Sequence, residues 1–140
     1  MRRVARYIYV AVAWVAIAGF LGNIYLAGMA VFVNRSYWDI HTEFGYAVGW
    51  IVPIFILLGL LAWIPRRLTA WLAALLLYYI FHTILPLLQE NLGWIAALHP
   101  VSAVLLVWLG LTHARRAGAL LLNPPASAPE PVPAETASHA

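Results

Sequence analysis

The stretch of sequence that decides the fold is YIYVAVAWVAIAGFLGNIYLAGMAVFV, residues 7–33, which carries no charged side chain over its 27 positions. A helix needs about 20 apolar residues to cross the hydrocarbon core of a bilayer, so this segment is long enough for one span. It follows the basic start MRRVAR but is too long for the apolar region of a secretory signal. The sequence therefore predicts a first membrane-spanning helix here.

Three more apolar segments follow, separated by short polar connections. We expect spans at about residues 7–33, 40–64, 68–88 and 94–112. The 140 residues are 64% hydrophobic and only 9% charged, whereas an ordinary soluble domain has about 25% charged residues. The predicted fold class is all-α, an integral membrane four-helix bundle with up-down-up-down order in residues 1–118. Residues 119–140, rich in proline and alanine, are expected to form a disordered or extended cytoplasmic tail.

Arginine placement predicts the orientation of the chain. The one arginine at the opposite set of span ends is Arg35, and the others are Arg2, Arg3, Arg6, Arg66, Arg67, Arg115 and Arg116. Positive residues stay on the cytoplasmic side, so we expect both termini to be cytoplasmic in a bacterial inner membrane. This pattern accounts for the net charge of +3 without a nucleic-acid partner. The absence of cysteine excludes disulfides, iron–sulfur clusters and covalently attached haem.

Histidines are the candidate functional residues, because ionisable side chains inside a membrane are costly. Counting about 1.5 Å per residue from the outer ends of the spans places His41, His82 and His99 about 6 to 9 Å below the outer surface, in one layer. His113 is expected at the cytoplasmic edge within a basic cluster, and His139 lies in the tail. The second and fourth spans of such a bundle face each other diagonally. His41 and His99 are therefore the candidate pair for holding a flat macrocycle or a metal.

Several neighbouring residues allow both a functional and a packing interpretation. Gly45 and Gly49 follow His41 on one helix face and could leave a bare shelf for a flat ring, or could serve close helix packing. Asn23 is expected to make an interhelical hydrogen bond. His82 is a weaker candidate ligand, because a polar network with a neighbouring tyrosine would also account for it. Pro86 frees the backbone carbonyl of His82 from its helix bond.

The pattern His-x-x-x-Gly at the start of the second span and Leu-His-Pro-Val-Ser-Ala at the start of the fourth resembles a family of small bacterial four-span membrane proteins of largely unassigned function. More broadly it resembles four-helix b-type membrane cytochromes, over about residues 5 to 117. The resemblance implies one non-covalent haem b with His41 and His99 as axial ligands of the iron. A second haem of the dihaem members would need a further histidine pair, and only His113 lies at that end.

Three classes of function remain open from the sequence. The first is a haem b protein that transfers electrons, alone or as a small subunit of a respiratory or photosynthetic complex, with quinone as a candidate partner. The second is a metal site formed by His41, His82 and His99, joined by Glu43 or Asp39. The third is a cofactor-free structural subunit. No Ser/His/Asp grouping or Gly-rich phosphate loop is present, so we expect no enzyme activity from this chain alone.

Overall fold

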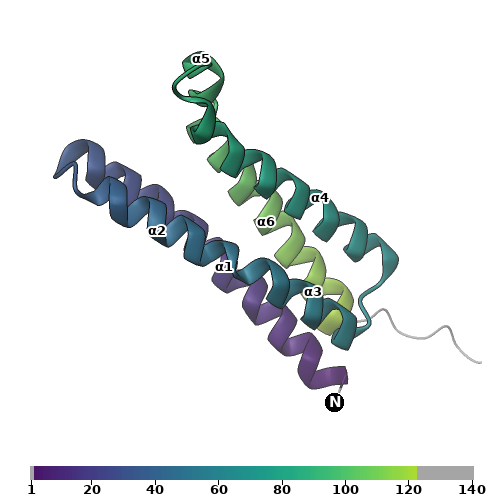
Figure 1. Cartoon of the computed structure of the whole chain (residues 1–140). Helices are drawn as coiled ribbons and strands as arrows, with labels where there is room; N and C mark the ends of the chain where they lie inside the picture. The colour runs from purple at the N-terminus through teal and green to yellow at the C-terminus, as the bar shows by residue number, and fades with distance from the viewer. Residues whose placement is uncertain (1, 123–140) are drawn as a thin grey trace, which may run out of the picture.

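The computed structural model describes residues 2–122, and its regular secondary structure is helical (Figure 1). Its elements are α1 (Arg2–Phe32), α2 (Tyr37–Gly49), α3 (Ile51–Ala62), α4 (Arg66–Ile84), the 3-10 helix η1 (Leu85–Leu88), α5 (Gly93–Ala96) and α6 (His99–Leu122). Together they form four segments long and apolar enough to cross a membrane: 2–32, 37–62, 66–88 and 93–122. The predictions of an all-α fold and of four apolar segments suited to a membrane are confirmed.

The boundaries differ from those expected at two places. The second segment is interrupted at Trp50, between α2 and α3, because Pro53 lacks the amide hydrogen that would bond to the carbonyl of Gly49 and its ring crowds that carbonyl. The fourth segment continues to Leu122, about ten residues beyond its expected end, so residues 119–122 are helical. The expected tail from residue 123 onward lies outside the described residues.

The four segments pack as two helix pairs. One pair is formed by α1 with α2 and α3, the other by α4 with α6, and the pairs meet along α1 and α6. No extended packing joins α2 to α4, and Figure 1 shows these two helices diverging toward the end that carries α5. The expected bundle is therefore open at one end.

A buried core holds the two pairs together at the opposite end. Small residues on facing sides of α1 and α6, among them Ala13 and Ala117, let the two backbones approach closely. Tyr9, Phe55 and Leu68 fill the space around them. Because the packed side chains gather near the chain's N-terminus, the opposite halves of the helix pairs are left free to separate.

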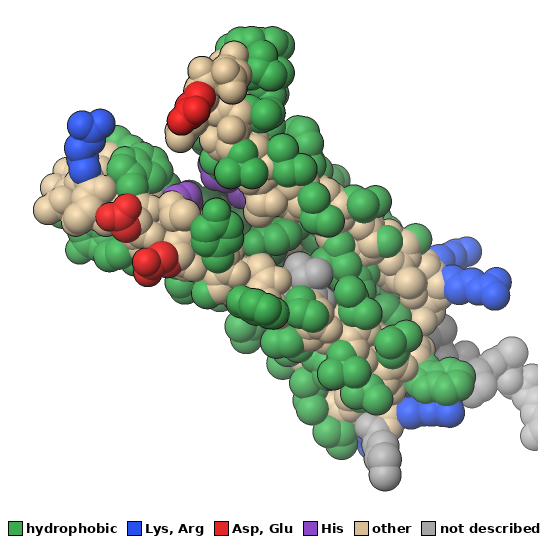
Figure 2. Space-filling model, viewed as in Figure 1, with side chains coloured by type: hydrophobic (Ala, Val, Ile, Leu, Met, Phe, Trp, Pro, Cys, Tyr) green, Lys and Arg blue, Asp and Glu red, His purple; other side chains and the backbone are tan. Residues whose placement is uncertain are grey.

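All arginines except Arg35 lie at the packed end. Arg2 lies over the Trp63 ring at 4.5 Å, and Arg116 over the Trp71 ring at 4.1 Å. Figure 2 shows basic side chains at this end, acidic side chains on the diverging arms, and a further basic side chain at the tip of one arm. The structure thus places the residues on which the predicted orientation depends at a single end of the molecule.

Candidate functional site

A cavity of about 820 Å³ lies between the diverging helix pairs. Its lining includes His41 from α2, His82 from α4 and His99 from the start of α6. Figure 2 shows histidine side chains in the hollow between the two arms. The cavity falls within the volume range of about 300 to 1,000 Å³ that is typical of small-molecule sites.

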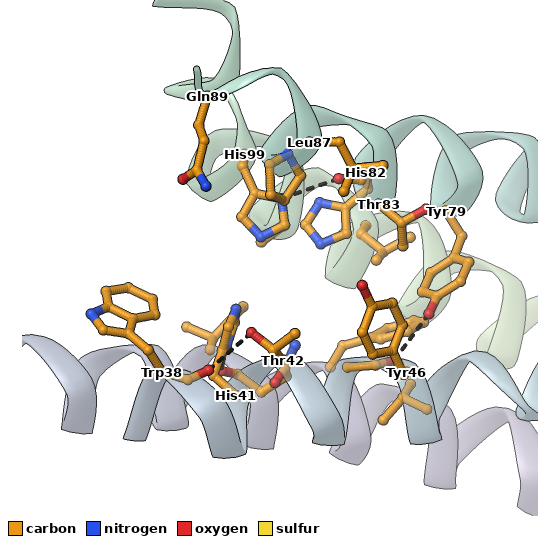
Figure 3. A pocket seen from close by; sticks show the side chains of 18 of the residues that line it. Trp38, His41, Thr42, Tyr46, Tyr79, His82, Thr83, Leu87, Gln89 and His99 are labelled. Atoms are coloured by element: carbon orange, nitrogen blue, oxygen red, sulfur yellow. Dashed lines mark hydrogen bonds between the residues drawn. The ribbon is translucent and has the colours of Figure 1, made fainter. Parts of the chain in front are cut away.

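The three histidines form one cluster, as their equal depth in the sequence suggested. The rings of His82 and His99 are stacked, with centroids 4.1 Å apart and an interplanar angle of 17°. The ring of His41 lies across the cavity, with its centroid 6.3 Å from that of His99 and its plane at 87° to it. Figure 3 shows His41 on one wall and His82 and His99 on the other, with ring nitrogens turned into the gap.

Backbone carbonyls determine the tautomers of His41 and His99. The Nδ1 of His41 donates to the carbonyl of Asn23 at 2.9 Å, and the Nδ1 of His99 donates to the carbonyl of His82 at 3.1 Å. A carbonyl can only accept, so in both rings Nδ1 carries the hydrogen and the neutral ring keeps a lone pair on Nε2. The same arrangement orients the histidine ligands of metal centres.

The carbonyl of His82 is available because of Pro86. Proline has no amide hydrogen, so the helix bond that would normally occupy this carbonyl is missing. The prediction that Pro86 frees this group is confirmed, and the structure shows that the Nδ1 of His99 uses it. Pro86 thus allows a backbone carbonyl of α4 to orient the His99 side chain at the start of α6.

Ser102 completes the link between α4 and α6. Its hydroxyl donates to the carbonyl of His99, one turn earlier, at 2.8 Å. The 2.7 Å contact between Ser102 Oγ and His82 Nδ1 is therefore donated by the histidine, and Nε2 of His82 also keeps a free lone pair. The proposed network of His82 with a tyrosine is wrong, because its partner is Ser102. The sequence spacing could have indicated the role of Ser102, because it lies three residues after His99 and a serine hydroxyl often donates to a carbonyl three or four residues back.

The glycine shelf expected below His41 is covered by protein. A side-chain carbon added at Gly45 would meet the Asn23 amide nitrogen at 3.1 Å, and one at Gly49 would meet the Tyr79 hydroxyl at 2.8 Å. Tyr79 also donates to the carbonyl of Gly45 at 3.1 Å. These glycines serve close packing, and only Gly45 also lines the cavity. The expected hydrogen bond from the Asn23 side chain is missing at its Oδ1, which is buried without a partner.

His113 is not the interfacial residue that its neighbouring arginines suggested. It is 0% exposed, and its Nε2 lies 2.8 Å from the hydroxyl of Tyr9, which is also 0% exposed. Phe55 packs edge-on against both rings. The helix continues past His113 and turns this position toward α1, so the side chain belongs to the core and not to the cavity.

The alternative of a metal site is not supported by the arrangement. Within residues 2–122, no group of three or more His, Asp or Glu side chains is placed to hold a metal ion. The stacked rings of His82 and His99 explain why, because two parallel rings direct their in-plane lone pairs alongside each other and not toward a common point. The site therefore offers imidazoles on two opposite walls, with His41 on one wall and His82 and His99 on the other.

Comparison with known proteins places part of the chain in context. No curated protein and no solved structure gave a significant match. Residues 23–87 match the model of a family of unknown function, DUF6220. This segment contains His41 and His82 and ends before His99. Over slightly less than half its length the chain is thus similar to the family DUF6220, and with its four apolar helices it fits a small membrane protein of unassigned function.

Proposed function

We propose that the chain is a haem b-binding electron-transfer protein of the bacterial cytoplasmic membrane, with His41 and His99 as the axial ligands. The observation that carries the proposal is the pair of free Nε2 atoms. Each of these two rings gives its Nδ1 hydrogen to a backbone carbonyl, and the remaining lone pairs lie on opposite walls of one cavity. Such lone pairs suit a metal centre, which accepts electron density from both sides.

The spacing of the two rings agrees with this role. Two imidazoles that coordinate one metal from opposite sides at about 2.1 Å each place their ring centroids roughly 6.4 Å apart. The centroids of His41 and His99 are 6.3 Å apart. This spacing supports the proposal that the two residues hold one iron from opposite sides.

A haem with two imidazole ligands has no open coordination position, so it supplies one-electron transfer and does not activate substrates. The chain's own residues prepare the ligands. The carbonyls of Asn23 and His82 hold the two rings in orientation and make Nε2 a stronger donor. Phe20 and Leu106 give the cavity apolar walls. We expect no enzyme activity from this chain alone, and a role beside other membrane subunits remains part of the proposal.

Both termini are proposed to face the cytoplasm. The argument is the grouping of seven arginines at one end of the molecule, against the single Arg35 at the other. The histidine cavity would then lie near the periplasmic side of the inner membrane.

The test is an absorption spectrum of protein purified from a haem-replete host. We expect the sharp, low-spin α band of bis-histidine haem b in the dithionite-reduced minus oxidised spectrum, with pigment that acid acetone extracts. His41→Asn and His99→Asn are the decisive variants, because the asparagine amide can still donate to the same carbonyl but has no atom at the position of Nε2. Each should lose the low-spin spectrum while keeping its helical circular dichroism.

His82→Asn is the matched control within the cluster. It keeps a donor for Ser102 and removes only a third Nε2, so the spectrum should remain. If His82→Asn erases the spectrum and His41→Asn does not, the iron lies between α4 and α6 and the assignment of His41 is wrong. Protein without haem absorbance would refute the proposal and favour a cofactor-free subunit.

A further inference from the structure

The packed end of the molecule carries positive charge that the described part of the chain does not neutralise. Seven arginines lie there, at the end opposite the histidine cavity. The acidic residues of the range 2–122 lie on the diverging arms, namely Asp39, Glu43 and Glu90. The two glutamates beyond this range, Glu130 and Glu135, offset at most two of the seven charges. The packed end therefore keeps an excess of positive charge.

One of these arginines is held over a tryptophan ring. The guanidinium carbon of Arg2 is 4.5 Å from the centroid of the Trp63 ring. Contact through the ring face leaves the N–H donors of a guanidinium, which lie in its plane, free for other partners. The one arginine side chain in residues 2–122 that donates a hydrogen bond is Arg6, to the carbonyl of Ala62. The Arg2 donors are therefore held in place but not used within this range.

The backbone of Trp63 adopts a conformation that a bulky residue disfavours. Its φ is 51° and its ψ is 56°, in the left-handed region at the end of α3, where glycine is the usual residue. The side chain is 67% exposed, so it contributes little to the packed core. A strained position that keeps a large, exposed ring points to a use for that ring. In this structure the ring supports the Arg2 guanidinium.

The turn that follows adds charge on one side and apolar surface on the other. Arg66 and Arg67 are the first two residues of α4, and both are exposed. Positive side chains at the start of a helix oppose its dipole, so the helix itself gains nothing from them. In the last turn of α3, Leu60 is 70% and Leu61 is 53% exposed. The turn thus joins a basic group of side chains to an apolar helix surface.

We propose that the turn between α3 and α4 binds the headgroup of an anionic phospholipid, with its phosphodiester hydrogen-bonded to the Arg2 guanidinium held over Trp63. The planar donors of arginine match the geometry of phosphate oxygens, and Arg66 and Arg67 add attraction from the same turn. Tryptophan is enriched at the headgroup level of membranes. The exposed leucines of α3 offer a surface for the acyl chains, which favours a lipid over a free anion.

A lipid with net negative charge should be preferred over a zwitterionic one, because the arginines repel the ammonium group of the latter. The experiment titrates the purified full chain, in an uncharged detergent, with phosphatidylglycerol or phosphatidylcholine of the same acyl chains. Binding is measured by isothermal titration calorimetry at about 150 mM salt, where charges more than about 8 Å apart are largely screened. We expect phosphatidylglycerol to bind roughly tenfold more tightly. Inorganic phosphate at the same concentration should not compete with it.

Two variants with the same change of charge test the position of the site. Arg2→Gln should weaken phosphatidylglycerol binding about fivefold, the effect expected for one arginine close to anionic lipid. Arg115→Gln is the matched control, because it removes one charge from an exposed position at the same end, on α6 and outside the turn. It should change the affinity by less than about twofold.

Trp63→Gly separates lipid binding from folding. Glycine adopts the left-handed conformation without strain, so this variant should be at least as stable as the unmodified chain against unfolding by sodium dodecyl sulfate. All the charges remain, but the support for Arg2 is lost, so phosphatidylglycerol should bind about threefold more weakly. Unchanged affinity in this variant would refute the role of the ring.

Three further results would overturn the proposal. Equal affinities for the two lipids would show that the surface does not select for charge. Equal losses in Arg2→Gln and Arg115→Gln would show a general effect of surface charge and no site at the turn. Displacement of phosphatidylglycerol by inorganic phosphate would identify a site for a free anion. None of these measurements involves the histidine cavity, so the haem proposal is tested separately.

Discussion

Replacing Tyr9 with phenylalanine tests whether the buried contact with His113 stabilises the junction of the two helix pairs. Both residues are 0% exposed, and the Tyr9 hydroxyl is 2.8 Å from Nε2 of His113. The other ring nitrogen, Nδ1, is buried and has no partner within the described chain. Tyr9→Phe would therefore leave the whole imidazole without a hydrogen bond at the centre of the α1–α6 interface.

Two ranges bound the expected cost. An unsatisfied buried polar group costs about 1 to 3 kcal/mol, whereas interhelical hydrogen bonds in membrane proteins average about 0.6 and reach about 1.7 kcal/mol. The cost of losing the hydrogen bond to His113 should lie at the upper end of the second range, because this side chain has no alternative partner among the described residues and no access to solvent. We expect Tyr9→Phe to lower the free energy of unfolding by about 1.5 kcal/mol, roughly a tenfold change in the unfolding equilibrium.

The assay is reversible unfolding by sodium dodecyl sulfate in mixed micelles, followed by circular dichroism. His113→Leu provides the second arm of a double-mutant cycle, since in that background the Tyr9 hydroxyl is itself unpaired and its removal should cost close to nothing. Tyr25→Phe, on the same helix at a position that is 65% exposed, is the control and should leave stability unchanged. A loss for Tyr9→Phe that is the same in both backgrounds would refute the reasoning.

Three further outcomes follow from the packing and the charge distribution. Gly49→Ala should destabilise the chain by about 1 to 3 kcal/mol, because its side chain would lie 2.8 Å from the Tyr79 hydroxyl, whereas Gly28→Ala meets nothing within 4 Å and should be neutral or slightly stabilising in the same unfolding assay. Ser102→Ala should cost about 1 to 2 kcal/mol by leaving the Nδ1 hydrogen of His82 unpaired, and Ser102→Thr should restore most of it; no loss with alanine would argue against the reported bond. A phosphatase reporter fused to the C-terminus should be inactive and a cytoplasmic fluorescent reporter active, and the reverse pattern would overturn the arginine argument.

The sequence by itself determined the features that depend on position along one helix. Runs of apolar residues predicted four segments suited to a membrane, and the rise per residue placed His41, His82 and His99 in one layer. The missing amide hydrogen of Pro86 is likewise a local property, and it correctly identified the carbonyl of His82 as free. None of these inferences required knowledge of how the helices pack.

Only the tertiary structure decided which helix faces meet. The arginines beside His113 suggested an interface, yet the helix turns this side chain into the core against Tyr9. The bare surface of Gly49 suggested a shelf for a flat ring, yet Tyr79 from a distant helix covers it. The divergence of α2 from α4, which creates the cavity, also depends on where the packed core lies. The sequence indicates how deep a residue lies along its membrane-spanning segment. Which neighbour its side chain meets depends on the packing of segments far apart in the chain.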